Sequence, residues 1–166
     1  MSDALFPGAW RLLATDLLER YRRGGLKLAT AESCTGGLVV ATLTSIAGSS
    51  DVVERGFTTY SNEAKERMLG VPRATLLSYG AVSEPVARAM AEGALAESLA
   101  DVAVSITGVA GPGGGSAEKP VGLVHFGCAR RGHETVTARH IFPGDRDAVR
   151  ASAVETALAL LNDAAR

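Results

Sequence analysis

The amino-acid sequence predicts an α/β fold of three layers, α/β/α, whose mixed, mainly parallel sheet ends in a hairpin. Short apolar and β-branched runs alternate along the chain with segments that have apolar residues at helical spacing. Two late strand-like runs flank the turn Arg131-Gly132-His133 without a helix between them, which indicates an antiparallel hairpin. The length of 166 residues is that of one domain, so residues 1–166 are expected to form a single unit.

Helices and strands alternate over the first half of the chain. Apolar residues at helical spacing predict a helix over 10–23, which a glycine pair ends. The apolar run 26–31 predicts a short strand, and 35–48 predicts a helix that stops at a glycine. The β-branched and aromatic residues of 52–60 predict a second strand. Residues 61–69, between polar cap residues and a glycine, predict another helix.

The second half carries the rest of the predicted sheet and its closing helix. Residues 108–120 are rich in glycine and have no apolar periodicity, which predicts a loop. The other elements are a short helix and turn at 72–79, helices at 84–99 and 149–161, and strands at 101–106, 121–129 and 135–142. In folds of this class, sites form at the loops that follow strands.

Composition and charge exclude several classes of protein. The chain is 46% hydrophobic and 21% charged, as in globular proteins and unlike disordered ones. Its 17 basic and 18 acidic residues give a formal net charge of -1, so no strong basic field exists to bind nucleic acid. No apolar run approaches the roughly 20 residues of a membrane helix, and no signal-peptide pattern begins the chain. Two widely spaced cysteines suit a reducing compartment, so we expect a cytoplasmic protein.

Several common active-site motifs are absent. The glycine-rich loop has neither the spacing of a phosphate-binding P-loop nor that of a dinucleotide-binding fingerprint. No serine lies in a G-x-S-x-G elbow. The three histidines lie on or beside the predicted hairpin, and no cysteine or carboxylate cluster completes a metal site around them. We therefore predict neither a metal nor another cofactor.

The segment AESCTGG follows a predicted strand and opens a predicted helix. Ser33 is a candidate nucleophile, and Cys34 is a weaker one. Gly36 and Gly37 would let a substrate approach the backbone closely. The first-turn N–H groups of the helix could then stabilise an anion or a developing oxyanion. The alternative is that Ser33 or Thr35 only caps the helix.

The segment TTYSNEAK places Tyr60 at a strand end and Lys65 near the start of the next helix. A cation there opposes the helix dipole, which makes the position unusual. In a desolvated pocket Lys65 could act as the base for a serine nucleophile, which requires its pKa to fall by roughly 3 units. The alternative is a solvated lysine on a helix surface.

Two further loops could line the same cleft. SITGVAGPGGGS brings Thr107 and Gly108, a hydroxyl and a flexible backbone donor, to a strand end. PGDRD brings Arg146 to a helix start, where its planar fork could hold a phosphate. Ser50 in AGSSD is most simply a turn residue, although it could reach the same cleft. The alternatives are a disordered surface loop for the first segment and a helix start capped by Asp145 for the second.

These segments together resemble the CinA C-terminal domain family, in order and over residues 26–161, nearly the whole chain. Members occur alone or fused to an N-terminal molybdopterin-binding-like domain, and 166 residues correspond to the stand-alone form. The segments are AESCTGG, IAGSSDVVERGFTTYSNEAK, GAVSEPVARAMAEGA, SITGVAGPGGGSAEKPVG and FPGDRDAVR.

The resemblance implies hydrolysis of the carboxamide of nicotinamide mononucleotide to nicotinate mononucleotide and ammonia, in pyridine-nucleotide recycling. It implies a metal-free serine–lysine mechanism in which Ser33 is the nucleophile and Lys65 the base, with Tyr60 orienting Lys65 or assisting proton transfer. The further residues it implies are Ser50 and Thr107, which would contact the reacting amide or relay protons, and Arg146, which would hold the substrate phosphate.

Two other functions remain compatible with the sequence. The same loops could hold a pyridine nucleotide in a non-catalytic sensor or regulatory module, in which Lys65 would bind phosphate as a cation. The same mechanism could also act on another amide. The Ala-rich helix 84–99 could form a homodimer face or lie in the core.

Overall fold

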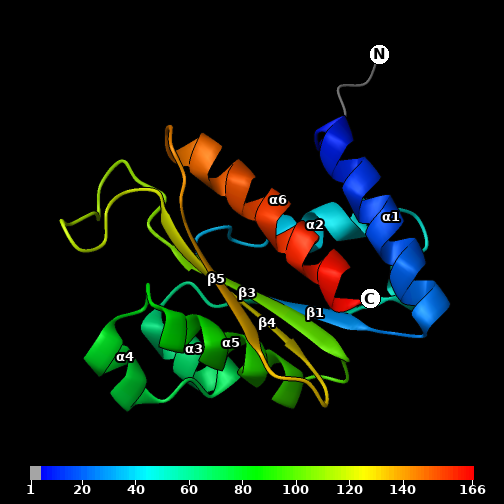
Figure 1. Ribbon diagram of the computed structural model, residues 1–166, viewed down its shortest axis with the longest axis horizontal. Helices are drawn as coiled ribbons and strands as arrows, with labels where there is room; N and C mark the ends of the chain where they lie inside the picture. The colour runs from blue at the N-terminus through cyan, green and yellow to red at the C-terminus, as the bar shows by residue number, and fades with distance from the viewer. Residues whose placement is uncertain (1–4) are drawn as a thin grey trace.

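The computed structural model describes residues 5–166 and has a five-stranded sheet between two layers of helices (Figure 1). The α/β class, the mixed sheet and the terminal hairpin are as predicted. The strands follow the spatial order β2-β1-β3-β4-β5. They are β1 (Leu28–Glu32), β2 (Val53–Thr58), β3 (Val102–Gly108), β4 (Leu123–Arg130) and β5 (Val136–Ile141).

The strand directions determine where the loops gather. β1 pairs in parallel with both β2 and β3, whereas β4 pairs antiparallel with β3 and with β5. The four strands β1, β2, β3 and β5 therefore run the same way and end at one edge of the sheet, here called the carboxyl edge. Only β4 runs in the opposite direction within the described sheet.

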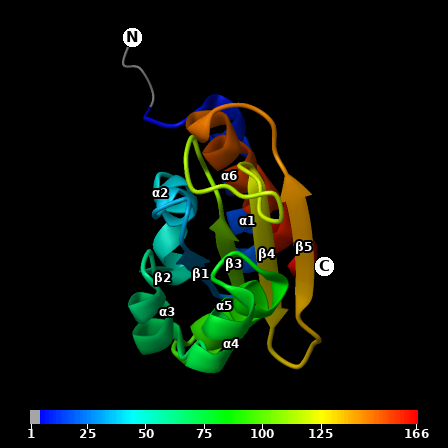
Figure 2. The ribbon, with the colours of Figure 1, turned by 90° about the vertical axis from the view of Figure 1, so that its left-hand side faces the viewer.

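The helices of residues 5–166 are divided between the two faces of the sheet, as Figures 1 and 2 show. One face carries α1 (Gly8–Gly24), α2 (Leu38–Thr44) and α6 (Arg146–Ala164). The other carries α3 (Asn62–Leu69), α4 (Arg73–Tyr79) and α5 (Glu84–Ala96). A short 3-10 turn, Ser49–Asp51, precedes β2. None of the helices in the described part of the chain is both long and apolar enough to cross a membrane.

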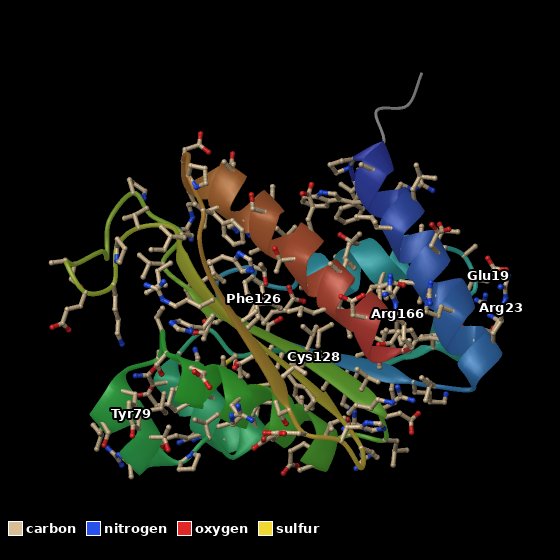
Figure 3. The ribbon with its side chains drawn as sticks, in the orientation of Figure 1. Glu19, Arg23, Tyr79, Phe126, Cys128 and Arg166 are labelled. Carbon is tan, nitrogen blue, oxygen red and sulfur yellow. The ribbon has the colours of Figure 1, made fainter. Side chains whose placement is uncertain are left out.

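The two faces have cores of different character. Beneath α1 and α6 the core is built of large side chains, and Phe126 and Cys128 of β4 point toward α6 (Figure 3). Beneath α5 the sheet presents mostly alanine, such as Ala103 and Ala129. Small residues there let α5 lie close to the strands. A Cβ on Gly127 would be 2.6 Å from the carbonyl oxygen of Ala87 in α5.

Two helix starts differ from the predictions for local reasons. α2 begins three residues later than predicted because Gly36 and Gly37 take positive φ values of 60° and 102°, which break the helical path. α6 begins three residues earlier, because the Asp145 carboxylate accepts from the N–H of Ala148 at 2.9 Å and caps it. Both differences lie at the carboxyl edge.

Candidate active site

A cleft of about 320 Å³ opens at the carboxyl edge of the sheet. Its polar walls come from the end of β3, from the segments that follow β1 and β2, and from the starts of α3 and α6. Ala81, Val82, Val109 and Ala110 form an apolar side. The polar lining residues are Ser33, Cys34, Tyr60, Lys65, Thr107 and Arg146.

Ser33 lies directly after β1 in a tight turn. Its N–H donates to the carbonyl of Ile106 in β3 at 2.9 Å, and its own carbonyl accepts from Gly36 at 3.0 Å. The N-cap of α2 is Gly37, with no side-chain cap. The interpretation of Ser33 or Thr35 as a helix cap is therefore wrong. Ser33 is 9% exposed, with its side chain at the cleft.

Lys65 is buried in the first turns of α3, with 1% of its surface exposed. Ser61 is the N-cap residue of this helix, and its hydroxyl accepts from the N–H of Ala64 at 3.0 Å. Lys65 Nζ lies 3.0 Å from Ser33 Oγ and 2.8 Å from the carbonyl oxygen of Thr59. The alternative of a solvated surface lysine is therefore wrong.

The surroundings of Lys65 favour its neutral form. No carboxylate forms an ion pair with it within the part of the chain that the structure describes. Burial lowers the pKa of Lys65 because the apolar interior disfavours the charged amine. A neutral amine has two N–H groups and one lone pair. It can donate to the carbonyls of Thr59 and Tyr60 while accepting the hydroxyl proton of Ser33.

Tyr60 and Arg146 meet at the rim of the cleft. Arg146 donates from Nη1 to the carbonyl of Gly111 at 2.8 Å and from Nη2 to the Tyr60 hydroxyl at 3.3 Å. Tyr60 is 65% exposed. Its main-chain carbonyl, 3.5 Å from Nζ, is the part of Tyr60 that contacts Lys65. Arg146 uses two of its five N–H groups in these contacts, so the others can bind an anion.

Thr107 and Gly108 lie at the end of β3. The buried hydroxyl of Thr107 donates to the carbonyl of Ala81 at 2.8 Å, and its oxygen can still accept a hydrogen bond from the cleft. Gly108 lines the cleft at a point where the backbone approaches β4 closely. A Cβ on Gly108 would lie 2.7 Å from Cγ2 of Val124.

Three residues expected at the site lie outside the cleft lining. Ser50 is exposed in the turn that precedes β2, at the opposite edge of the sheet, so the structure does not bring it to Ser33 and Lys65. Gly36 and Gly37 shape the turn behind Ser33 and do not border the cleft. They lie close to other side chains instead. A Cβ on Gly36 would be 3.6 Å from Nη2 of Arg150.

Cys34 lines the cleft beside Ser33, but its chemistry is unfavourable for attack. Burial raises the pKa of the Cys34 thiol to about 11. Because the thiolate is the reactive form, the thiol is a poor nucleophile near neutral pH. Ser33, in contact with Lys65, is the nucleophile candidate that the geometry favours.

The sequence reasoning missed Glu32, the last residue of β1. Its carboxylate is fully buried and accepts from the N–H groups of Val39 and Val40 at 2.9 and 3.1 Å. These are first-turn donors of α2, so they are not free for a substrate oxyanion as expected. An acidic residue directly after the predicted strand 26–31 and before a candidate nucleophile marks the position in the sequence but does not reveal its partners.

Within residues 5–166, no group of three or more histidine, cysteine, aspartate or glutamate side chains is placed to hold a metal ion.

Comparison with known proteins agrees with this architecture. The family model described as CinA C-terminal domain matches residues 11–165. The chain is 58% identical over 149 residues to nicotinamide-nucleotide amidohydrolase PncC of Escherichia coli (strain K12), covering 90% of each sequence. It is 56% identical over 141 residues to a CinA-like protein of Akkermansia muciniphila, covering 85% of this chain and 34% of that protein.

A solved structure shows the same fold over the full length. The competence/damage inducible protein CihA from Agrobacterium tumefaciens superposes with a TM-score of 0.96 at 48% sequence identity, covering 99% of this chain and 100% of that one. The chain thus spans about a third of the CinA-like relative and nearly all of the shorter relatives. It belongs to the CinA C-terminal domain family.

Proposed function

We propose that this protein hydrolyses the carboxamide of nicotinamide mononucleotide, giving nicotinate mononucleotide and ammonia. The observation that carries the proposal is the contact of 3.0 Å between the buried Nζ of Lys65 and Oγ of Ser33, inside a cleft. The name of the relative from Escherichia coli, nicotinamide-nucleotide amidohydrolase, supplies the substrate class.

In the proposed mechanism, Ser33 Oγ attacks the carboxamide carbon while Lys65 Nζ takes the hydroxyl proton. The tetrahedral intermediate collapses as Lys65 returns this proton to the leaving nitrogen, which departs as ammonia. An ester between Ser33 and the nicotinoyl group remains. A water molecule, activated by Lys65, then hydrolyses the ester and releases the carboxylate product.

The shape of the cleft suits a small anionic substrate. Its volume of about 320 Å³ is at the lower end of the range for small-molecule sites. The apolar side at Val82 and Val109 can face a pyridine ring. Arg146 at the rim has N–H groups left for a phosphate, and Thr107 can accept from the amide nitrogen.

We place the reaction in the cytoplasm, where it would recycle pyridine nucleotides. Both cysteines of the chain are free and buried, as suits a reducing compartment.

The test measures ammonia and nicotinate mononucleotide formed from nicotinamide mononucleotide. We expect turnover by the wild type and its loss in Ser33→Ala and Lys65→Ala. Ser50→Ala is the matched serine control, at the opposite edge of the sheet, and should keep kcat/KM within about twofold. Mass spectrometry of quenched reactions should find the nicotinoyl ester on Ser33.

Two outcomes would change the proposal. A wild type that binds the nucleotide but releases no ammonia would favour the non-catalytic sensor. Faster turnover of the riboside, of free nicotinamide or of another amide would keep the mechanism and change the substrate.

A further inference from the structure

Glu32 is a buried carboxylate with an unusual set of partners. Its side chain is 0% exposed, and it forms no ion pair within residues 5–166. Oε1 accepts from the Thr35 hydroxyl at 2.6 Å and from the Val39 N–H at 2.9 Å. Oε2 accepts from the Val40 N–H at 3.1 Å. The Thr30 hydroxyl also donates to Oε2, at 3.4 Å, so three of the four donors to Glu32 belong to the segment that directly follows it.

Arg150, in the second turn of α6, binds the same segment through its acceptors. Its Nε donates to the carbonyl of Cys34 at 3.2 Å, and its Nη2 donates to the carbonyl of Thr35 at 3.3 Å. The two charged residues thus meet at Thr35, whose hydroxyl binds Glu32 and whose carbonyl binds Arg150. Neither charged side chain lines the cleft.

The segment 33–37, here called the nucleophile turn, requires such restraint. Gly36 and Gly37 both have positive φ and give the turn a large conformational freedom in the absence of tertiary contacts. Catalysis requires Ser33 to stay in contact with Lys65, and a displacement of about 1 Å can lower a rate by about 10²-fold. Burial of a carboxylate costs folding free energy that its hydrogen bonds must offset. A contribution to stability is therefore a weak explanation for a glutamate at this buried position.

We propose that Glu32 and Arg150 are positioning residues that hold the nucleophile turn from its donor and acceptor sides and so keep Ser33 against Lys65. Their kinetic effect rests on the proposed amidohydrolase activity. Their effect on the turn does not, because it is a property of the fold.

The first experiment compares kcat and KM for nicotinamide mononucleotide. Glu32→Gln keeps the size of the side chain but replaces one acceptor oxygen with an NH₂ group. This group would face an N–H or O–H donor and could not accept its hydrogen bond. We expect kcat to fall about 10- to 100-fold while KM stays within about threefold, because the cleft contacts are unchanged. Arg150→Met should behave similarly, and Arg150→Lys should recover part of the loss.

Arg131→Met is the matched control. Arg131 also donates to main-chain carbonyls, those of Leu95, Ser98 and Ala100, but it lies at the far edge of the sheet. Its replacement should lower Tm and leave kcat unchanged. A purely structural role of Glu32 and Arg150 would give the same result in their variants.

The second experiment is hydrogen–deuterium exchange of the ligand-free protein, which needs no activity. In Glu32→Gln, a peptide covering 33–40 should exchange faster than in the wild type, while a peptide covering β4 should not change. An inactive wild type would contradict the proposed function and leave this measurement to decide the positioning role. Wild-type kcat in folded Glu32→Gln and Arg150→Met, or unchanged exchange over 33–40, would overturn the inference. If Glu32→Gln does not fold, the Arg150 variants decide it by the same two readouts.

Discussion

Replacement of Lys65 by arginine tests whether the buried amine must lose its proton for the reaction to proceed. Arginine retains a long cationic side chain but stays protonated at every accessible pH. It can still donate to the carbonyl of Thr59, but it cannot accept the hydroxyl proton of Ser33. The substitution therefore separates a base from a phosphate-binding cation.

The expected loss of kcat/KM follows from the contact between Lys65 Nζ and Ser33 Oγ, because an arginine cannot accept a proton there. A positioned general base contributes about 10²- to 10⁴-fold to the rate, or roughly 3 to 5.5 kcal/mol. Lys65 transfers protons in both the formation and the hydrolysis of the ester in the proposed mechanism, and its Nζ is 3.0 Å from Ser33 Oγ. We therefore expect kcat/KM of Lys65→Arg to fall by at least about 10³-fold.

The pH dependence gives an independent readout. Burial lowers the pKa of Lys65 below its ordinary value of about 10.4. The protonated amine is inactive as a base, so log kcat/KM of the wild type should rise with unit slope as pH increases and level off at the lowered pKa. The assay is ammonia release between about pH 6 and 10, with folding checked by circular dichroism at each pH.

Two results would refute this reasoning. One is a flat kcat/KM profile for the wild type across the whole range together with a pKa of Lys65, measured by NMR, that lies inside it. The other is a folded Lys65→Arg variant that retains more than a tenth of wild-type kcat/KM, since a guanidinium cannot act as the base.

Three further predictions concern stability and binding. Lys65→Met should abolish turnover but raise Tm by about 2–4 °C per kcal/mol of relieved burial cost. This gain should shrink as pH rises toward about 10.4, because the unfolded chain binds more protons than the folded one between the lowered pKa and that value. Arg146→Lys should raise KM about tenfold with kcat within threefold, since lysine cannot bind Gly111, Tyr60 and a phosphate together; steady-state kinetics measure this. Gly93→Ala should destabilise by about 3 kcal/mol in urea unfolding, because its Cβ would lie 1.9 Å from the carbonyl oxygen of Leu69.

The loops that form the cleft could be predicted, because strands that run in parallel end at the same edge of the sheet. Ser33, Tyr60 and Thr107 each lie at or just after the end of a predicted strand, and parallel strands bring such positions to one edge. Arg146 joins them because β5 also ends at that edge. The same reasoning argues against Ser50, which precedes its strand. Only the family resemblance had placed it at the amide.

The roles of Glu32 and Arg150 could not be predicted from local sequence. A carboxylate at a strand end is usually exposed, and its burial here depends on amides seven and eight residues later in the chain. Arg150 lies 115 residues from its acceptor Thr35. Helical periodicity places Arg150 on a turn of α6 but does not say which loop packs against it. Such partners become visible only once the layers are assembled.

Two buried ionisable side chains near Ser33, those of Glu32 and Lys65, have separate hydrogen-bond partners. Glu32 precedes Ser33 in the chain and Lys65 contacts the Ser33 side chain, yet Glu32 and Lys65 form no ion pair with each other in the part of the chain that the structure describes. A carboxylate beside Nζ would raise the pKa of Lys65 and keep the amine protonated, which would prevent it from acting as a base. Glu32 instead binds the amides of α2, while Lys65 binds main-chain carbonyls and the hydroxyl of Ser33. Separate hydrogen-bond partners thus let the fold bury Glu32 against the amides of α2 without an ion pair to Lys65, as the proposed role of Lys65 as a base requires.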